Sequence, residues 1–253
     1  MKIERFEVID RCLFWKEKRV LIVGDLHLGY EDSLNESGIS IPRSQIKETL
    51  DIFERVFKIT GVVKEIILLG DVKHYFPRIL KDEFNDFYKL IDFFRKNLGE
   101  EGRVIITKGN HDMILEPIIR NYSDVLLKEY YILDNLMFFH GDKLSLRRIG
   151  LGFFDEKIGL VVVGHYHPAI LLKDDSKSER YKCYLFGISK DFNDKKTIFM
   201  PSFFPLIEGS DIFNHQQLNL KELKKSKVFV LGDFNEVYEF SFKELKKIST
   251  PTP

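Results

Sequence analysis

The chain has 253 residues, of which 44% are hydrophobic, so it is long enough for one substantial α/β domain with a large core and short for two. Lys plus Arg and Asp plus Glu both number 39, and this balance excludes a bulk electrostatic attraction to nucleic acid. The charged N-terminus lacks a signal-peptide stretch, no segment reaches the length of a membrane span, and the two cysteines form no ligand pair, so we expect a reduced cytoplasmic protein with no membrane partner.

Short apolar runs alternate with stretches of helical periodicity in the first half of the chain, a pattern typical of an α/β domain. In chain order we predict a strand at 20–23, a loop at 24–30, a helix at 42–60 before Gly61, a strand at 65–69, a helix at 80–98 and a strand at 103–107. Leu90 and Phe93 widen the apolar stripe of the second helix. We attribute this wider apolar surface to ordinary core packing, and a homodimer interface is the alternative.

The second half of the chain is richer in strands. In order we predict a hairpin of 130–133 and 136–139 around Asp134-Asn135, a helix at 144–154, strands at 160–163, 169–172, 180–186 and 197–200, and a closing hairpin of 227–231 and 237–240. Because both halves contribute to one set of polar motifs, we predict a single domain over residues 1–253, with two packed sheets flanked by helices.

Six of the seven histidines lie in five short motifs, each after an apolar run. The motifs are Gly24-Asp25-Leu26-His27, Gly70-Asp71-Val72-Lys73-His74, Gly109-Asn110-His111-Asp112, His140-Gly141-Asp142 and Gly164-His165-Tyr166-His167. Asp25 and His27 are two residues apart at a strand end, so we expect their side chains to leave one face of an extended chain, and likewise those of His165 and His167. Loops at the carboxyl ends of strands converge in open α/β sheets, so the pattern predicts a two-metal hydrolytic site rather than scattered surface polar pairs.

In this order the motifs resemble those of the calcineurin-like metallophosphoesterase superfamily: Asp-x-His, Gly-Asp, Gly-Asn-His-Asp/Glu, His and Gly-His-x-His. The resemblance covers residues 24–168 and implies a four-layer α/β fold, a two-sheet β-sandwich flanked by helices. It implies that Asp25, His27 and His167 hold one divalent metal ion. Asn110, His140 and His165 would hold the other, and Asp71 would bridge the two. Such a pair of ions binds phosphate oxygens and lowers the pKa of a bridging water, whose hydroxide attacks phosphorus.

The ligand chemistry narrows the choice of metal. Mixed His, Asp and Asn ligation suits manganese, iron or zinc better than an all-oxygen magnesium site. The resemblance to nuclease members of the superfamily favours two Mn²⁺ ions.

Two further histidines have expected catalytic roles. The resemblance implies that His111 contacts the phosphate or the leaving group, as a general acid or a transition-state stabiliser; a purely structural role is the alternative. Protein phosphatases of the superfamily carry Asp-Arg where this chain has His74 and Tyr75. The Gly-Asp-x-x-His pattern instead resembles the SbcD-type nuclease branch, in which this histidine also contacts phosphate; a solvated loop histidine is the alternative.

Weaker motifs resemble small SbcD-related phosphoesterases found in archaea and beside bacterial DNA-repair genes. They are Asp25-Leu26-His27-Leu28-Gly29 with Gly38-Ile39-Ser40-Ile41-Pro42, and Met200-Pro201-Ser202-Phe203 with Gly209-Ser210; they shape the mouth of the site or form a structural loop. Asp142 stands where many relatives have a second histidine. We also expect no DNA-capping region after the phosphoesterase core.

Three basic residues follow His140: Lys143, Arg147 and Arg148. They either contact a nucleic-acid backbone or form a solvated helix face. We expect His215, which lies outside every motif, on a surface loop.

These features predict a dinuclear-metal-dependent phosphoesterase, specifically a phosphodiesterase or nuclease that acts on single strands or exposed ends of nucleic acid. A phosphodiesterase or phosphatase of small cyclic or free nucleotides is the alternative. A scaffold with a dead site is disfavoured, because such proteins lose ligand residues and this chain retains all seven.

Overall fold

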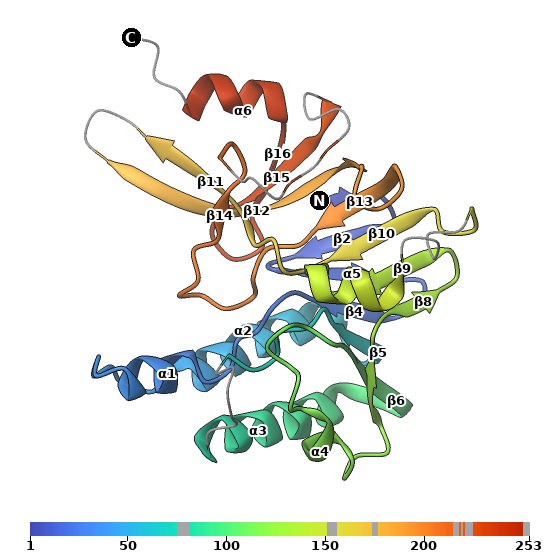
Figure 1. Cartoon of the computed structure of the whole chain (residues 1–253), viewed down its shortest axis with the longest axis vertical. Coiled ribbons are helices and arrows are strands. Elements are labelled where there is room, and N and C mark those ends of the chain that lie inside the picture. Colours follow the sequence, from blue (N-terminus) through green and yellow to red (C-terminus); the bar gives the residue numbers. More distant parts are fainter. Residues whose placement is uncertain are drawn as a thin grey trace.

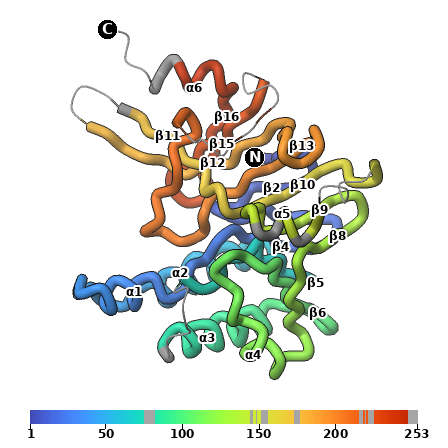
Figure 2. The backbone as a smooth tube through the Cα atoms, viewed as in Figure 1, coloured from blue at the N-terminus to red at the C-terminus, as the bar shows by residue number. Residues whose placement is uncertain are grey.

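Two β-sheets pack face to face and carry helices on their outer sides in the computed structural model (Figures 1 and 2). The structure describes residues 1–74, 81–150, 156–173, 177–214, 218, 220 and 225–249. Within them, the helices are α1 (Tyr30–Glu36), α2 (Gln45–Thr60), α3 (Lys81–Asn97), α4 (Glu116–Ile119), α5 (Lys143–Ile149) and α6 (Phe242–Ser249).

The first sheet contains seven strands in sequence order: β1 (Lys2–Ile3), β2 (Phe6–Ile9), β3 (Cys12–Trp15), β4 (Val20–Val23), β5 (Val63–Leu68), β6 (Leu98–Thr107) and β7 (Val125–Lys128). Strands β1 to β4 are joined antiparallel, whereas β4 to β7 run parallel. The parallel strands all end at one edge of the sheet, so the loops that leave them meet there.

The second sheet has the order β14-β11-β12-β13-β10-β9-β8, with β15 and β16 added beside β12. Its strands are β8 (Tyr131–Leu133), β9 (Leu136–Phe139), β10 (Leu160–Val163), β11 (Pro168–Lys173), β12 (Ser178–Ser189), β13 (Lys195–Phe199), β14 (Ser210–Asp211), β15 (Lys227–Leu231) and β16 (Val237–Ser241). Strands β9, β10 and β13 run parallel, and this region faces the parallel half of the first sheet.

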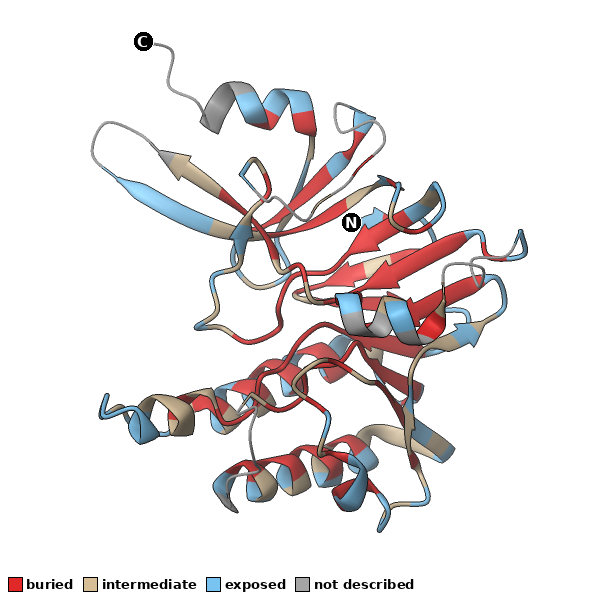
Figure 3. Ribbon diagram, in the orientation of Figure 1, coloured by how far each residue is buried: buried red, intermediate tan, exposed pale blue. Residues whose placement is uncertain are grey.

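Strand periodicity explains the layers. Val20 and Ile22 of β4 point into the core between the sheets, where they meet residues such as Phe138 and Val162 of the second sheet. Their neighbours Leu21 and Val23 point the other way, into a core shared with α2, α3 and α4. A third core lies under α5 and α6. The strands are therefore buried on both faces, as Figure 3 shows, and the predicted four-layer α/β fold is confirmed.

Most predicted elements are present, with shifted ends. The helix expected from residue 42 begins at Gln45, because the carboxylate of Glu31 accepts hydrogen bonds from the N–H groups of Ser44 and Gln45 and supplies the cap. Residues 24–30 were expected to be a loop, but α1 begins at Tyr30. Strands β1 to β3, β7 and β14, and helices α4 and α6, were not predicted. Residues 151–155 of the expected helix at 144–154 lie outside the described residues, as does His215.

Ordinary core packing accounts for the apolar surface of α3. Leu90 is fully buried, and Phe93 packs partly buried against the same core. The homodimer and the single domain over residues 1–253 stay predictions. Among the described residues, no helix has the length and apolarity required to span a membrane.

Candidate metal centre

All seven predicted ligand residues follow strands that end at the same edge of the molecule. Asp25 and His27 follow β4, Asp71 follows β5, and Asn110 follows β6 of the first sheet. His140 follows β9, and His165 and His167 follow β10 of the second sheet. The loops that follow these strands in the two sheets therefore lie next to each other at this edge.

The backbone at these residues is not extended. The φ angles are 47° at His27, 44° at Asp71, 60° at His165 and 43° at His167, all in the left-handed region. The expectation that Asp25 and His27 leave one face of an extended chain, like His165 and His167, is therefore wrong. The strands end earlier, and tight loops bring the side chains together. Non-glycine residues adopt this conformation at a cost of roughly 1–3 kcal/mol, and such residues concentrate at functional sites.

The side chains form two adjacent groups. Asp25, His27 and His167 have ligand atoms within 4.8 Å of one another, as do Asp71, His140 and His165. Asn110 belongs to the second group, because its Oδ1 lies 3.1 Å from Nε2 of His140. The groups adjoin, since Nδ1 of His140 is 3.4 Å from Oδ1 of Asp25. The two groups have the members that the resemblance assigned to the two ions, and His27, His74 and His111 form a third group with ligand atoms equally close. The division of ligands between two metals stays a prediction.

The donor atoms fit divalent metal ions. Nε2 of His27 is buried and has no hydrogen-bond partner in the part of the chain that the structure describes, although buried polar atoms are normally paired. Nε2 of His167 is also buried, and it lies 3.2 Å from Oδ1 of Asp25, another predicted ligand of the same group. Burial lowers the pKa of His27 to about 3 and that of His165 to about 4, despite the nearby carboxylates. Both rings are therefore neutral near pH 7, the form that binds metal.

His140 is oriented by the protein. Its Nδ1 donates a hydrogen bond to the carbonyl of Leu69 (2.8 Å), which leaves Nε2 facing Oδ2 of Asp71 at 3.2 Å. Burial alone lowers the pKa of His140, but the charge and hydrogen bond of Asp71, with Asp25 and the Leu69 carbonyl, outweigh burial and raise this pKa to about 10.

Asp112 ties two ligand loops together, a role that the sequence analysis did not assign. Its two carboxylate oxygens accept hydrogen bonds from the N–H groups of Val72 and Gly109, each at 3.0 Å. Burial and the neighbouring charge of Asp71 raise its pKa to about 6. Its place at the end of the Gly109-Asn110-His111-Asp112 motif was the available signal.

Glycines in the motifs make room for the ligand side chains. A Cβ at Gly109 would lie 2.2 Å from Oδ1 of Asp71, and a Cβ at Gly164 would lie 2.6 Å from Oδ2 of Asp25. Gly70 combines a left-handed φ of 84° with a Cβ position only 2.7 Å from Nδ1 of His140. At these three glycines the backbone therefore lies so close to the ligand side chains that a Cβ atom would collide with them.

The two predicted catalytic histidines lie together beside His27. Nδ1 of His74 is 3.3 Å from Nδ1 of His27, and the rings of His74 and His111 stack with centroids 5.4 Å apart. The N–H of His111 donates to Oδ1 of Asp71 at 2.9 Å. Burial, followed by the neighbouring His111, lowers the pKa of His74 to about 4. Both rings are half-buried, so they form a boundary between the ligands and solvent.

Distant residues hold the loops, and the sequence analysis missed them. The side-chain amide of Gln45 donates to the His27 carbonyl (2.7 Å), while its oxygen accepts from the N–H groups of Gly29 and Tyr30. The ammonium of Lys182 donates to the carbonyls of Ser202 and Phe204. The N–H of Phe203 in that loop donates in turn to the Asp25 carbonyl (2.9 Å), so the 200–203 motif supports the site structurally.

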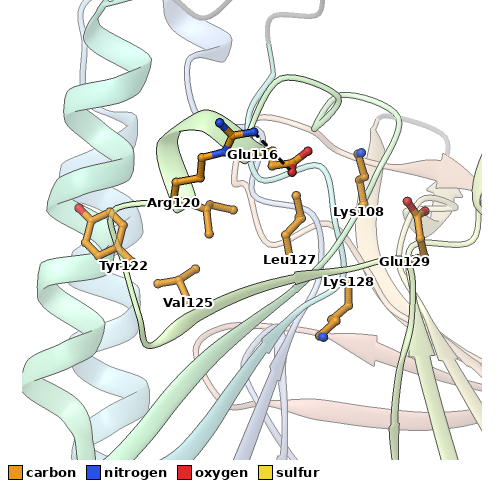
Figure 4. A pocket seen from close by; sticks show the side chains of 9 residues that line it. Lys108, Glu116, Arg120, Tyr122, Val125, Leu127, Lys128 and Glu129 are labelled. Atoms are coloured by element: carbon orange, nitrogen blue, oxygen red, sulfur yellow. Dashed lines mark ion pairs between the residues drawn. The ribbon is translucent and has the colours of Figure 1, made fainter.

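A pocket of about 380 Å³ borders the loop that carries Asn110 (Figure 4). Its floor includes Ile119, Val125 and Leu127, and Lys108, which directly precedes Gly109, stands on its rim. Glu116 and Arg120 pair with each other there. Within the described residues, the ammonium groups of Lys108 and Lys128 make no ion pair, and Glu129 lines the same pocket.

Comparison with known proteins agrees with this geometry. The profile of the calcineurin-like phosphoesterases matches residues 18–232, which include every motif described above. The chain belongs to the calcineurin-like phosphoesterase family. The protein is thus a metal-dependent phosphoesterase, a hydrolase of phosphate esters.

One solved structure supports the fold of this phosphoesterase. The crystal structure of the Pseudomonas putida nuclease MPE aligns with a TM-score of 0.60 at 19% identity and covers 93% of this chain and 94% of that one. The solution NMR structure of the Thermotoga maritima protein TM1076 covers 88% of this chain and 96% of its own at 15% identity, with a TM-score of 0.34. No curated protein matches the sequence.

Proposed function

We propose that this phosphoesterase uses two divalent metal ions to hydrolyse phosphodiester bonds in nucleic acid, preferentially in single strands or at exposed ends. The observation that carries the proposal is the pair of adjoining groups of ligand atoms, in which Nε2 of His27 is buried without a hydrogen-bond partner among the described residues. Asp25, His27 and His167 hold one ion, Asn110, His140 and His165 hold the other, and Asp71 serves both. Bound divalent ions polarise a phosphate and generate a nucleophile from water near neutral pH.

The protein's own groups then position and stabilise the substrate. His111 and His74 lie beside His27 of the first ligand group, and their role in this proposal is to contact the phosphate and the leaving oxygen. A diester carries less negative charge than a monoester and bears a second substituent. An imidazole pair therefore suits a diester better than the fixed cationic side chain of a phosphatase does.

Local positive charge favours a nucleic-acid substrate over a small nucleotide. The protein has no net charge, but Lys108 lies beside Asn110, and Lys143 and Arg147 are exposed on α5, which follows His140. Cations beside the metals bind the phosphates that flank a cleaved bond. The side chain of Arg148 lies outside the described part of the chain. Mn²⁺ is the proposed metal, with iron or zinc as alternatives, because the ligand set mixes imidazole with oxygen donors.

A substrate panel tests the proposal. Single-stranded DNA, duplex DNA, RNA, a cyclic nucleotide, a generic diester and a generic monoester are each incubated with Mn²⁺, Fe²⁺, Zn²⁺ or Mg²⁺. We expect cleavage of the diester and of single-stranded nucleic acid with Mn²⁺. His74→Ala should reduce turnover of diesters more than that of monoesters, and His215→Ala, outside every motif, is the matched control. Efficient monoester or cyclic-nucleotide hydrolysis with no cleavage of nucleic acid under any metal would overturn it.

A further inference from the structure

An aromatic side chain stands at the edge of the proposed phosphate site. The ring of Tyr30 contacts that of His74 edge-on, with centroids 4.9 Å apart and an interplanar angle of 70°. His74 adjoins both His27 and His111. Tyr30 is thus separated from the metal ligands by a single ring, a placement that neither the motifs nor the proposed chemistry uses.

Hydrogen bonds fix the position of Tyr30 relative to the predicted ligand His27. Its N–H is shared between the carbonyl of His27 (3.3 Å) and the side-chain oxygen of Gln45 (3.2 Å). The amide of the same Gln45 also donates to the His27 carbonyl. Gly29, in the left-handed conformation with a φ of 84°, turns the chain so that α1 begins at Tyr30. One glutamine therefore fixes both the metal ligand and the aromatic residue.

The Tyr30 ring is packed against a buried ring and is partly exposed to solvent. The buried Phe204 packs against it with centroids 5.3 Å apart, at an angle of 59°. Tyr30 itself is partly exposed, and within the described residues no other ring stacks parallel to it and no group hydrogen-bonds to its hydroxyl. A partly exposed aromatic ring that is supported by a neighbouring ring and lies beside a phosphate site is a feature that binds nucleobases in proteins that hold single strands.

We propose that Tyr30 is a stacking platform for the base of the nucleotide that flanks the scissile phosphate. This inference rests on the proposed activity on nucleic acid and adds the reason for a single-strand preference, because a paired and stacked base cannot turn onto Tyr30. Stacking is tolerant of base identity, since every base has a π face. The platform therefore selects for an unpaired nucleotide and against phosphodiesters that carry no base.

Binding is tested with a single-stranded oligonucleotide that contains 2-aminopurine, whose fluorescence is quenched by stacking. A His111→Ala background with Mn²⁺ slows turnover so that binding is observed directly. We expect Tyr30→Ala to weaken binding roughly 5- to 150-fold, the range for loss of one base–aromatic stack, and to abolish the quenching. Tyr30→Phe keeps the ring and should bind like the parent. Tyr238→Ala, an exposed tyrosine on the outermost strand β16, is the control.

Cleavage provides the second measurement, with single abasic positions placed in turn along the oligonucleotide. The protein with Tyr30 should lose efficiency when the abasic position flanks the cleaved bond, and Tyr30→Ala should be insensitive to that position. Binding and abasic sensitivity unchanged in Tyr30→Ala would overturn the inference. Loss in Tyr30→Phe equal to that in Tyr30→Ala would also overturn it, because the hydroxyl would then be responsible. Failure of the proposed function is distinct: the wild-type protein would cleave no nucleic acid at all.

Discussion

His140 illustrates, at the scale of one residue, how the protein holds a ligand position in the absence of metal. Its pKa of about 10 means that both ring nitrogens are protonated at pH 7, with one proton directed at the Leu69 carbonyl and the other at Asp71. A metal ion at Nε2 must displace the second proton. By contrast, His27 and His165 are already neutral and release none.

We therefore predict that metal binding releases about one proton from His140, so that affinity rises about tenfold per pH unit below pH 10. Because the folded pKa is raised from 6.5, His140 stabilises the metal-free fold fully below pH 6.5, and this contribution is lost as the pH rises towards 10. Calorimetry at pH 6 in buffers of different ionisation enthalpy measures the proton. His140→Asn keeps an oxygen ligand and should release about one proton fewer; equal release from both proteins would contradict the assignment.

The roles proposed for Asp71 and His111 predict different effects of substitution. Asp71→Ala removes a carboxylate of the second ligand group, which we propose to bind both metal ions, so we expect it to abolish tight metal binding and activity together. His111→Ala should retain metal and reduce turnover by about 10²–10⁴, the usual contribution of a positioned acid–base group. Metal content after gel filtration and initial rates on a diester distinguish the two. If His111→Ala loses metal as completely as Asp71→Ala, the division of roles is wrong.

At the scale of an element, the turn after β6 depends on the absence of a side chain at Gly109. A methyl group there would lie 2.2 Å from Oδ1 of Asp71, so either the turn or the Asp71 carboxylate must move. We predict that Gly109→Ala weakens metal binding severely. Gly99→Ala is the matched control, because its new Cβ would meet nothing closer than Val62 at 3.5 Å.

Metal titration and thermal unfolding check this prediction together. Gly99→Ala should behave like the wild type in both measurements, within the roughly 0.5 kcal/mol that is typical of harmless surface changes. A Gly109→Ala protein with wild-type metal affinity would show that the turn can shift without moving Asp71.

At the scale of the whole molecule, the metal centre joins the two sheets. Asp25, His27, Asp71 and Asn110 come from the first sheet, and His140, His165 and His167 come from the second. A group that binds the folded state alone stabilises it by mass action, about 2.7 kcal/mol at a free concentration one hundred times the Kd. We predict that Mn²⁺ at that excess raises the Tm by about 5–10 °C, and that a chelator reverses the rise.

The control for this effect is Asp71→Ala, which lacks the shared ligand and should show the same Tm with metal and with chelator. Scanning calorimetry of the full chain makes the comparison. A wild-type Tm that does not respond to metal or chelator would mean that the ions do not connect the sheets in the folded protein.

The sequence by itself determined the strands that lead into the ligand motifs and the order of those motifs. The runs 20–23, 136–139 and 160–163 are continuous apolar stretches followed by glycine and polar residues, and strand burial and turn chemistry are local properties that such patterns record. The family resemblance, carried by those motifs, also implied how the ligands divide between two metals. The short strands β1 to β3 and helix α1 escaped prediction, because their stability comes from packing rather than from local periodicity.

Tertiary structure alone decided what surrounds the ligands. The backbone at His27 and Asp71 is left-handed because the loops that carry them pack against each other. The local sequence does not predict this conformation for histidine or aspartate at these positions. Gln45, Asp112 and Lys182 reach their partners from 18 to 40 residues away, and Ser202 contacts the Asp25 carbonyl across 177 residues. Sequence spacing carries no information about contacts between loops so far apart, because only the packing of the two sheets brings those loops to one edge.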